Sequence, residues 1–93
     1  MIINDQKLHM ITKALDNSLR IKILYYLQEN VESNVSNLMH YFATSQPNIS
    51  RHLKILADAN LVFSRKDGQE RIYQLSDNHV SQLLDTLKTH IND

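Results

Sequence analysis

Residues 45–56 read Ser45-Gln46-Pro47-Asn48-Ile49-Ser50-Arg51-His52-Leu53-Lys54-Ile55-Leu56, and they are the most informative segment of the chain. Ser45 is a favourable helix N-cap, and Pro47 is tolerated in the first turn because its missing N–H has no helical partner there. Ile49, Leu53 and Leu56 recur at helical spacing and predict a buried face. The opposite face is then expected to carry Asn48, Ser50, Arg51, Lys54 and Ile55. The stretch therefore predicts an amphipathic helix with an outward polar face.

A second short helix is predicted just upstream. Ser33 or Asn34 can cap it, and its apolar residues are Val35, Leu38, Met39 and Phe42. Only Ala43-Thr44-Ser45 joins the two, so the pair is a helix-turn-helix candidate. On the second helix, Gln46, Asn48 and Arg51 can form paired hydrogen bonds with base edges. The alternative is that this polar face is simply solvated, as on any amphipathic helix. Periodicity alone favours neither interpretation over the other.

The rest of the chain predicts three further helices and one hairpin. The helices are expected over about residues 5–16, from an N-cap at Asn17 onward, and over about residues 77–92. The last of them carries an apolar stripe of Val80, Leu83, Leu84, Leu87 and Ile91. Residues 61–65 and 71–75 are rich in β-forming side chains and flank Asp67-Gly68, a strong hairpin-turn pair. The expected fold class is mainly α with a β-hairpin wing: a winged helix-turn-helix of four helices, two strands and a closing helix.

Length and composition exclude several classes of protein. The 93 residues suit one domain, and no linker or repeat divides residues 1–93. The chain has no cysteine, which excludes disulfides, thiolate metal sites and a cysteine nucleophile. No apolar run approaches the ~18 residues of a membrane span and no signal pattern is present, so we expect a cytoplasmic protein with no membrane partner. Without a nucleophile motif or a phosphate loop, an enzyme is not expected.

Charge is balanced overall but unevenly distributed. Ten basic and ten acidic residues cancel, yet between Ser45 and Lys66 four basic residues face a single acidic one, Asp58. A hairpin with a basic tip beside a recognition helix can rest on a phosphate backbone. The residues expected to contact double-stranded DNA are Ser45, Gln46, Asn48, Ser50, Arg51, Lys54, Arg65 and Lys66.

The chain resembles the ArsR/SmtB family of winged-helix repressors. Three segments carry the resemblance: residues 15–24 (Leu-Asp-Asn-Ser-Leu-Arg-Ile-Lys-Ile-Leu), residues 45–56 as quoted above, and the hairpin from Leu61-Val62 through Gly68 to Ile72-Tyr73. Ser18 departs from the pattern, since many members have proline there. The resemblance implies a homodimer that binds a palindromic operator and is released by an inducer, usually a metal ion. The dimerisation helices are expected at about residues 5–16 and 77–92.

One inducer site of such repressors is excluded by residue type. Some members bind soft metals through a pair of cysteines near the start of the third helix. The matching positions here are Asn34 and Ser36, which cannot supply thiolates. Sensing of arsenic, lead or cadmium by that route is therefore excluded.

Four candidate metal ligands lie at the two ends of the last helix. Asp77 and His79 stand near its start, and His90 and Asp93 near its end. His90 lies eleven positions after His79, which is about three turns and ~16 Å of axis, so one chain cannot place both around one ion. If two such helices pack antiparallel, the start of one meets the end of the other, and symmetry makes two sites per dimer. Two imidazoles and two carboxylates suit tetrahedral zinc or cobalt. The ligand types do not distinguish these two metals from nickel.

This spacing resembles the zinc- and cobalt-responsive branch of the family, of the CzrA and SmtB type, with Asp93 where Glu or His is usual. The resemblance implies that Zn(II) or Co(II) releases the repressor from DNA. The alternative is that Asp77 only caps the helix and His90 only complements its dipole. A metal-bound His90 would need an acceptor for its other ring N–H, and Asn60, at the end of the recognition helix, is the candidate.

The remaining histidines are expected to have mainly structural roles, and two other functions are compatible with the sequence. His9 and His40 are expected at the surface or half-buried, and His52 is expected to buttress the fold or touch phosphate. A winged-helix regulator can also be constitutive or sense a non-metal ligand, although the lack of cysteine argues against thiol redox sensing. A winged helix can serve as a protein-docking module instead, and then Asn48 and Arg51 could change without effect.

Overall fold

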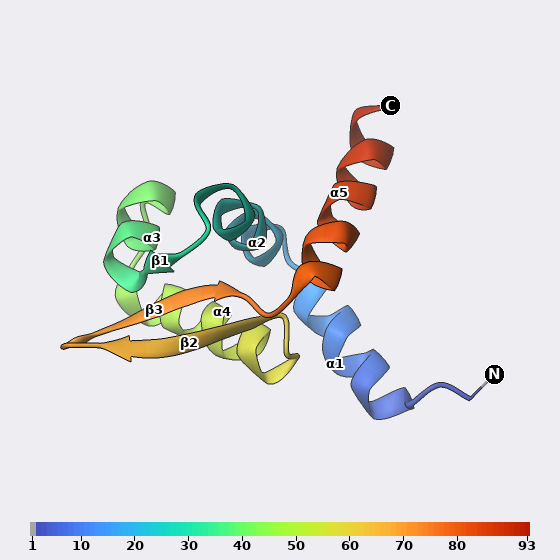
Figure 1. Cartoon of the computed structure of the whole chain (residues 1–93), viewed down its shortest axis with the longest axis horizontal. Coiled ribbons are helices and arrows are strands. Elements are labelled where there is room, and N and C mark those ends of the chain that lie inside the picture. The colour runs from blue at the N-terminus through green and yellow to red at the C-terminus, as the bar shows by residue number, and fades with distance from the viewer. Residues whose placement is uncertain (1) are drawn as a thin grey trace.

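The computed structural model describes residues 2–93, which form five helices and a small antiparallel sheet (Figure 1). The helices are α1 (Asp5–Leu15), α2 (Ser18–Asn30), α3 (Val35–Phe42), α4 (Gln46–Asp58) and α5 (Asn78–Asn92). The strands are β1 (Ser33–Asn34), β2 (Val62–Asp67) and β3 (Glu70–Leu75). The predicted winged helix-turn-helix is confirmed. No helix within residues 2–93 is long and apolar enough to cross a membrane.

Each helix begins at a polar side chain that accepts a hydrogen bond from the first turn. The five N-caps are Asn4, Asn17, Asn34, Ser45 and Asp77. Such a side chain satisfies one of the N–H groups that has no partner inside the helix. The first helix ends at Leu15, one residue before the prediction, and the last begins at Asn78, one residue after it, because Asp77 is its cap.

The hairpin is not a two-stranded ribbon, as the sequence predicted, but part of a three-stranded sheet. Strand β1 pairs antiparallel with β3, and the strand order is β1-β3-β2. Two residues are too few to show an alternating pattern, so β1 could not be predicted from periodicity. The turn also lies one residue later than expected: Asp67 pairs with Glu70, so Gly68 and Gln69 form the loop. Gly68 takes the first central position with a φ of 65°, a left-handed backbone conformation that glycine adopts without strain.

Replacing Gly68 by alanine is expected to lower the free energy of unfolding by about 1 kcal/mol. The positive φ is the whole cause, because a Cβ built at this position meets no atom within 4 Å. Urea denaturation of the wild type and of Gly68→Ala measures the difference. A loss several times larger would contradict this account, since it would require a packing clash that the structure does not contain.

The core lies between α2, α3, α4 and the base of the wing. Its fully buried side chains include Ile23, Leu24, Leu27, Leu38, Ile49, Leu53 and Leu56. The predicted inward face of α4 is thereby confirmed. Ile55, which was expected on the outward face, is half-buried and packs against the core, because the helix is partly covered on that side by its neighbours.

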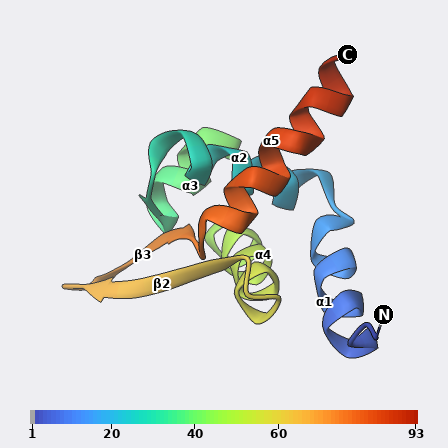
Figure 2. The ribbon, with the colours of Figure 1, turned by 45° about the vertical axis from the view of Figure 1, so that its right-hand side comes forward.

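Helices α1 and α5 project from one side of this body and carry the two termini (Figures 1 and 2). The apolar stripe of α5 divides accordingly: Val80 and Leu84 are buried in the core, whereas Leu83 and Ile91 are 44% and 64% exposed. On α1, Leu8 is exposed and Ile11 is half-buried. Both projecting helices therefore present large apolar side chains to solvent.

Candidate functional site

The helix-turn-helix is formed by α3, a three-residue turn and α4. Ala43 leaves α3 in the left-handed region with a φ of 51°. The N–H of Thr44 donates to the carbonyl of Met39 at 3.1 Å, which closes the turn. Ser45 then caps α4 through its hydroxyl, which accepts from the N–H of Asn48 at 3.3 Å. These local bonds fix the direction in which α4 leaves the turn.

The outward face of α4 is polar and partly pre-ordered. Gln46, Ser50, Arg51 and Lys54 are exposed, and Asn48 is half-buried. The Asn48 amide donates to the hydroxyl of Thr44 at 2.9 Å and accepts from Arg51 Nη2 at 2.9 Å. The guanidinium keeps further donors free for a base edge. An Arg that is already held by its neighbour loses less side-chain entropy when it binds.

Two of the expected DNA-contacting side chains pair with carboxylates in the free chain. Lys54 Nζ lies 3.2 Å from Asp58 Oδ2, and Arg65 Nη2 lies 3.0 Å from Glu32 Oε2. All four side chains are about half exposed or more, and such surface pairs contribute little to stability. Phosphates can therefore replace the carboxylates at small cost.

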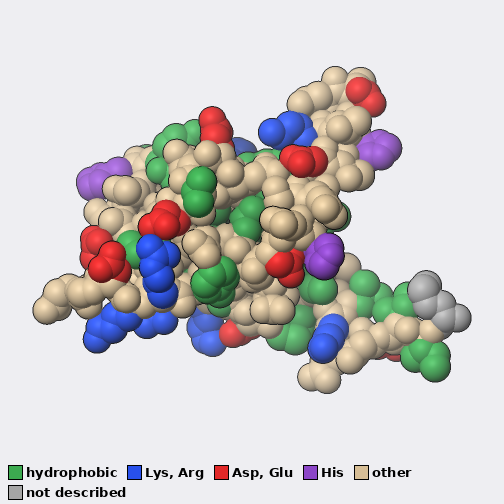
Figure 3. Space-filling model, viewed as in Figure 1, with side chains coloured by type: hydrophobic (Ala, Val, Ile, Leu, Met, Phe, Trp, Pro, Cys, Tyr) green, Lys and Arg blue, Asp and Glu red, His purple; other side chains and the backbone are tan. Residues whose placement is uncertain are grey.

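The structure adds Arg71 to this surface, a residue that the sequence prediction missed. Arg71 pairs in register with Lys66 across the wing, and its Nε donates to the hydroxyl of Ser64 at 3.0 Å. Together with Gln46 and Ser50 of α4 it lines a groove between the wing and the recognition helix. Basic side chains gather over the wing in Figure 3. A turn at Asp67-Gly68 would place Gln69 opposite Lys66, so the one-residue error in the predicted turn concealed the pairing of Arg71 with Lys66.

His52 does not face outward with its neighbours on α4. It is 4% exposed, and Arg20 Nη1 lies 3.0 Å from its Nδ1. Burial, with the charges of Arg51 and Arg20, lowers the pKa of His52 below its usual value. The expected buttressing role is confirmed, and a phosphate contact by this buried ring is not.

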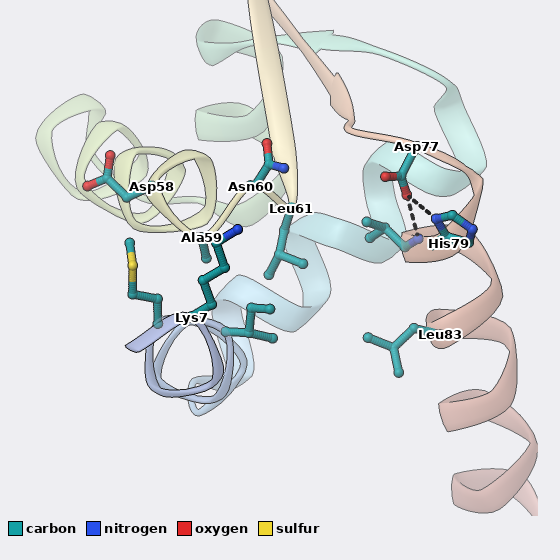
Figure 4. Close-up of a pocket in the computed structure, with 11 residues that line it drawn as sticks. Lys7, Asp58, Ala59, Asn60, Leu61, Asp77, His79 and Leu83 are labelled. Carbon is teal, nitrogen blue, oxygen red and sulfur yellow. Dashed lines mark hydrogen bonds and ion pairs between the residues drawn. The ribbon is translucent and has the colours of Figure 1, made fainter. Parts of the chain in front are cut away.

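Asp77 and His79 lie together at the start of α5 (Figure 4). Asp77 Oδ1 accepts from the N–H of Val80 at 3.2 Å and lies 3.8 Å from His79 Nδ1. The side chains of Asp77 and His79 are 52% and 90% exposed. One Asp77 oxygen thus serves as the helix cap, and both side chains are at least half exposed.

His90 and Asp93 lie at the other end of α5 and are exposed. Within residues 2–93 of one chain, no three histidine or carboxylate side chains gather closely enough to hold a metal ion. The structure therefore brings Asp77 to His79 but does not bring these two to His90 and Asp93.

A cavity of about 390 Å³ opens beside Asp77 and His79. Its mostly apolar lining comes from α1, α5 and the segment that joins α4 to β2, and includes Ile11, Leu61 and Leu83 (Figure 4). Asn60, the candidate acceptor for a metal-bound His90, lines the same cavity. The end of the recognition helix is therefore adjacent to Asp77 and His79 of its own chain.

Asn34 and Ser36 have no metal-binding chemistry of the thiolate kind. Asn34 caps α3 by accepting from the N–H of Asn37 at 2.8 Å, and its amide donates to Glu70 Oε1 at 3.0 Å. Asn34 thus fixes the start of α3 against β3. Ser36 is exposed on the first turn of α3.

Comparisons with known proteins agree on the family. Residues 17–64, just over half of the chain, match the model of the bacterial regulatory protein arsR family. An arsenical resistance operon repressor of Staphylococcus aureus is 39% identical over 87 residues, which are 94% of this chain and 79% of that protein. The repressor SmtB of Mycobacterium tuberculosis is 35% identical over 72 residues, 77% of this chain and 53% of that protein. The solved structure of HlyU from Vibrio cholerae is 32% identical with a TM-score of 0.85, and each chain is covered in full.

The helix-turn-helix, the wing and these similarities point the same way. The matched segment contains the two helices and the turn that carry the polar reading face. The chain belongs to the ArsR family and is a DNA-binding winged-helix transcriptional regulator, not an enzyme.

Proposed function

We propose that this regulator is a homodimeric repressor that binds operator DNA and is released when Zn(II) or Co(II) binds between the last helices of its two subunits. The DNA-binding residues are those of the α4 face and the wing, from Ser45 through Lys66, with Arg71 added. The metal ligands are Asp77 and His79 of one subunit with His90 and Asp93 of the other.

A single observation carries the proposal. Helix α5 bears two potential ligands at each end and exposed apolar side chains, Leu83 and Ile91, along its length. Burying such a stripe against an antiparallel copy is favourable at roughly 25 cal/mol per Å² of apolar surface. That arrangement places the start of each α5 beside the end of the other. Two ligand pairs that are remote within a chain become neighbours between chains.

The available donor atoms fit the proposed metals. Imidazole nitrogen and carboxylate oxygen are common ligands of zinc and of cobalt. The side chains of His79 and Asp77 are at least half exposed, so neither has to give up a buried partner in order to bind. The similar repressors of S. aureus and B. subtilis are named for arsenical resistance. This chain has no cysteine with which to bind arsenite as a thiolate complex.

The cavity beside Asp77 supports a route by which metal binding could affect the recognition helix α4. Asn60 and Leu61, which follow directly after α4, line it together with Asp77 and His79. A change in the angle between two α5 helices would therefore press on the end of α4 and move the two recognition helices out of register with successive major grooves, which are roughly 34 Å apart. When bound, the metal would cross-link the two subunits. The chain's own α1, α4 and α5 would then carry the change in helix angle to the recognition helices.

The experiment is a zinc titration of a protein–DNA complex, with a fluorescent duplex selected from a random pool by the metal-free protein. Saturating zinc is expected to weaken binding by roughly 5- to 150-fold, and a chelator is expected to restore it. Magnesium, which prefers an all-oxygen octahedral site, serves as the control. An affinity that no tested metal changes would leave a constitutive regulator, or one with a non-metal ligand, as the function.

A further inference from the structure

Arg20 is a buried cation that joins three helices. It lies in the first turn of α2 with 7% of its surface exposed. Its Nε donates to the carbonyl of Ala14 at 2.8 Å and its Nη2 to the carbonyl of Lys13 at 3.1 Å, both at the end of α1. Its Nη1 lies 3.0 Å from His52 Nδ1 on α4. One side chain thus ties the end of α1 to the middle of the recognition helix.

The buried charge of Arg20 is compensated by hydrogen-bond acceptors. Among residues 2–93, Arg20 forms no ion pair with a carboxylate. Its charge is instead compensated by the carbonyl end of α1, where the helix dipole is negative, and by a ring nitrogen. Arginine has no acceptor atom, so Nδ1 of His52 must be the acceptor and the ring must be neutral with its proton on Nε2. The lowered pKa of His52 agrees with a neutral ring.

The two helices that Arg20 joins have different tasks. Helix α1 packs against both α2 and α4 and leaves its Leu8 exposed to solvent, where the proposed dimer can cover it. Helix α4 carries Asn48 and Arg51, the hydrogen-bonded pair that is proposed to read the DNA. The orientation of α4 relative to α1 therefore determines how far apart two reading faces lie in a dimer.

We propose that Arg20, bonded to His52, is a positioning residue that fixes the recognition helix relative to the dimerisation helix and thereby sets the half-site spacing that the dimer accepts. This inference rests on the proposed homodimer but not on the metal. It assigns Arg20 and His52, neither of which faces the DNA, a role in the choice of operator.

The test compares two duplexes: the one selected by the wild-type protein, and the same duplex with one base pair inserted at its centre. The insertion moves the half-sites apart by about 3.4 Å and turns one by about a tenth of a revolution. All measurements contain a chelator, so that metal has no part. The wild type is expected to lose about tenfold or more in affinity on the respaced duplex, because a rigid dimer matches one spacing.

Variants separate the Arg20–His52 link from general stability. Arg20→Met removes the link from one end, and the double variant Arg20→Met/His52→Leu replaces both partners by apolar groups, which avoids an unpaired buried group at His52. Both are expected to bind the selected duplex more weakly and to lose less than about threefold on respacing. His52→Asn keeps an acceptor near the position of Nδ1 and cannot be protonated, so it is expected to behave as the wild type does.

The outcomes are distinct. Folded Arg20→Met and double variants that keep the full wild-type penalty for respacing would overturn the positioning role while leaving the proposed function intact. The role is likewise overturned if ring-nitrogen NMR shifts of His52 show a proton on Nδ1 at pH 7. A wild-type chain that is monomeric in the presence of its duplex overturns the proposed function itself, and the positioning role with it.

Discussion

Mixing the His79→Ala and His90→Ala variants is expected to restore tight zinc binding, although each variant alone has lost it. Removing one of four ligands should weaken zinc affinity by roughly 100-fold or more, since even an outer-shell partner of a ligand contributes 10- to 100-fold. In a mixed dimer, however, one of the two sites receives both substitutions and the other receives none. The intact site combines His79 of one subunit with His90 of its partner.

The stoichiometry makes this result specific. Isothermal titration of an equimolar mixture, after subunits have exchanged, should give one tight site per mixed dimer, and Co(II) should show the absorption of a tetrahedral site. His40→Ala, which removes an exposed histidine from α3, is the control and should bind zinc as the wild type does. The DNA affinity of the metal-free single variants should stay within a few-fold of the wild type.

Two results would contradict the shared site. Zinc binding that survives in both single variants would mean that these histidines are not ligands and that Asp77 serves only as the cap of α5. Loss of binding in both variants without recovery in the mixture, despite confirmed subunit exchange, would place both histidines in a site within one subunit. The structure disfavours the latter, because one helix holds the two residues near its opposite ends.

Replacing Arg51 by alanine is expected to lower the affinity for the selected duplex by about 1–3 kcal/mol, which is roughly 5- to 150-fold. Arg51 is exposed on the outward face of α4 and is held by Asn48 at 2.9 Å, so its guanidinium is oriented before it meets a base. Fluorescence anisotropy with the selected duplex and with a scrambled duplex measures the effect. The loss on the scrambled duplex should be smaller, because a base contact carries sequence information and a phosphate contact does not.

Lys88→Ala is the matched control for this prediction. It removes the same charge from α5, where Lys88 lies over the ring of Tyr25 at 5.4 Å from the ring centre, on a different element from the reading face. Its effect on the selected duplex should be limited to the general change in net charge. If Arg51→Ala and Lys88→Ala weaken binding equally, or if the losses of Arg51→Ala on the two duplexes are equal, α4 does not read bases through Arg51.

Much of the fold could be predicted because the five helices and the hairpin depend on local sequence signals. Asn17, Ser45 and Asp77 are caps in the structure as well as in the prediction, since the capping side chain and the N–H that it accepts from are three residues apart. Strand β1 could not be predicted, because its pairing partner β3 lies some forty residues away. The role of Arg20 was missed for the same reason: its partner His52 is remote in sequence.

Local sequence accounts for the order of the five helices and the hairpin, for the helix-turn-helix and its polar face, and for the absence of any thiolate chemistry. These follow from spacing over three or four residues and from residue type, and both are local properties. Tertiary structure alone decided which half of the α5 stripe is buried, that Asn60 lies beside Asp77, and that the charge of Arg20 is satisfied by α1 and His52. Those facts depend on which distant surfaces meet, and burial and buried hydrogen bonds are settled only when the helices pack against one another.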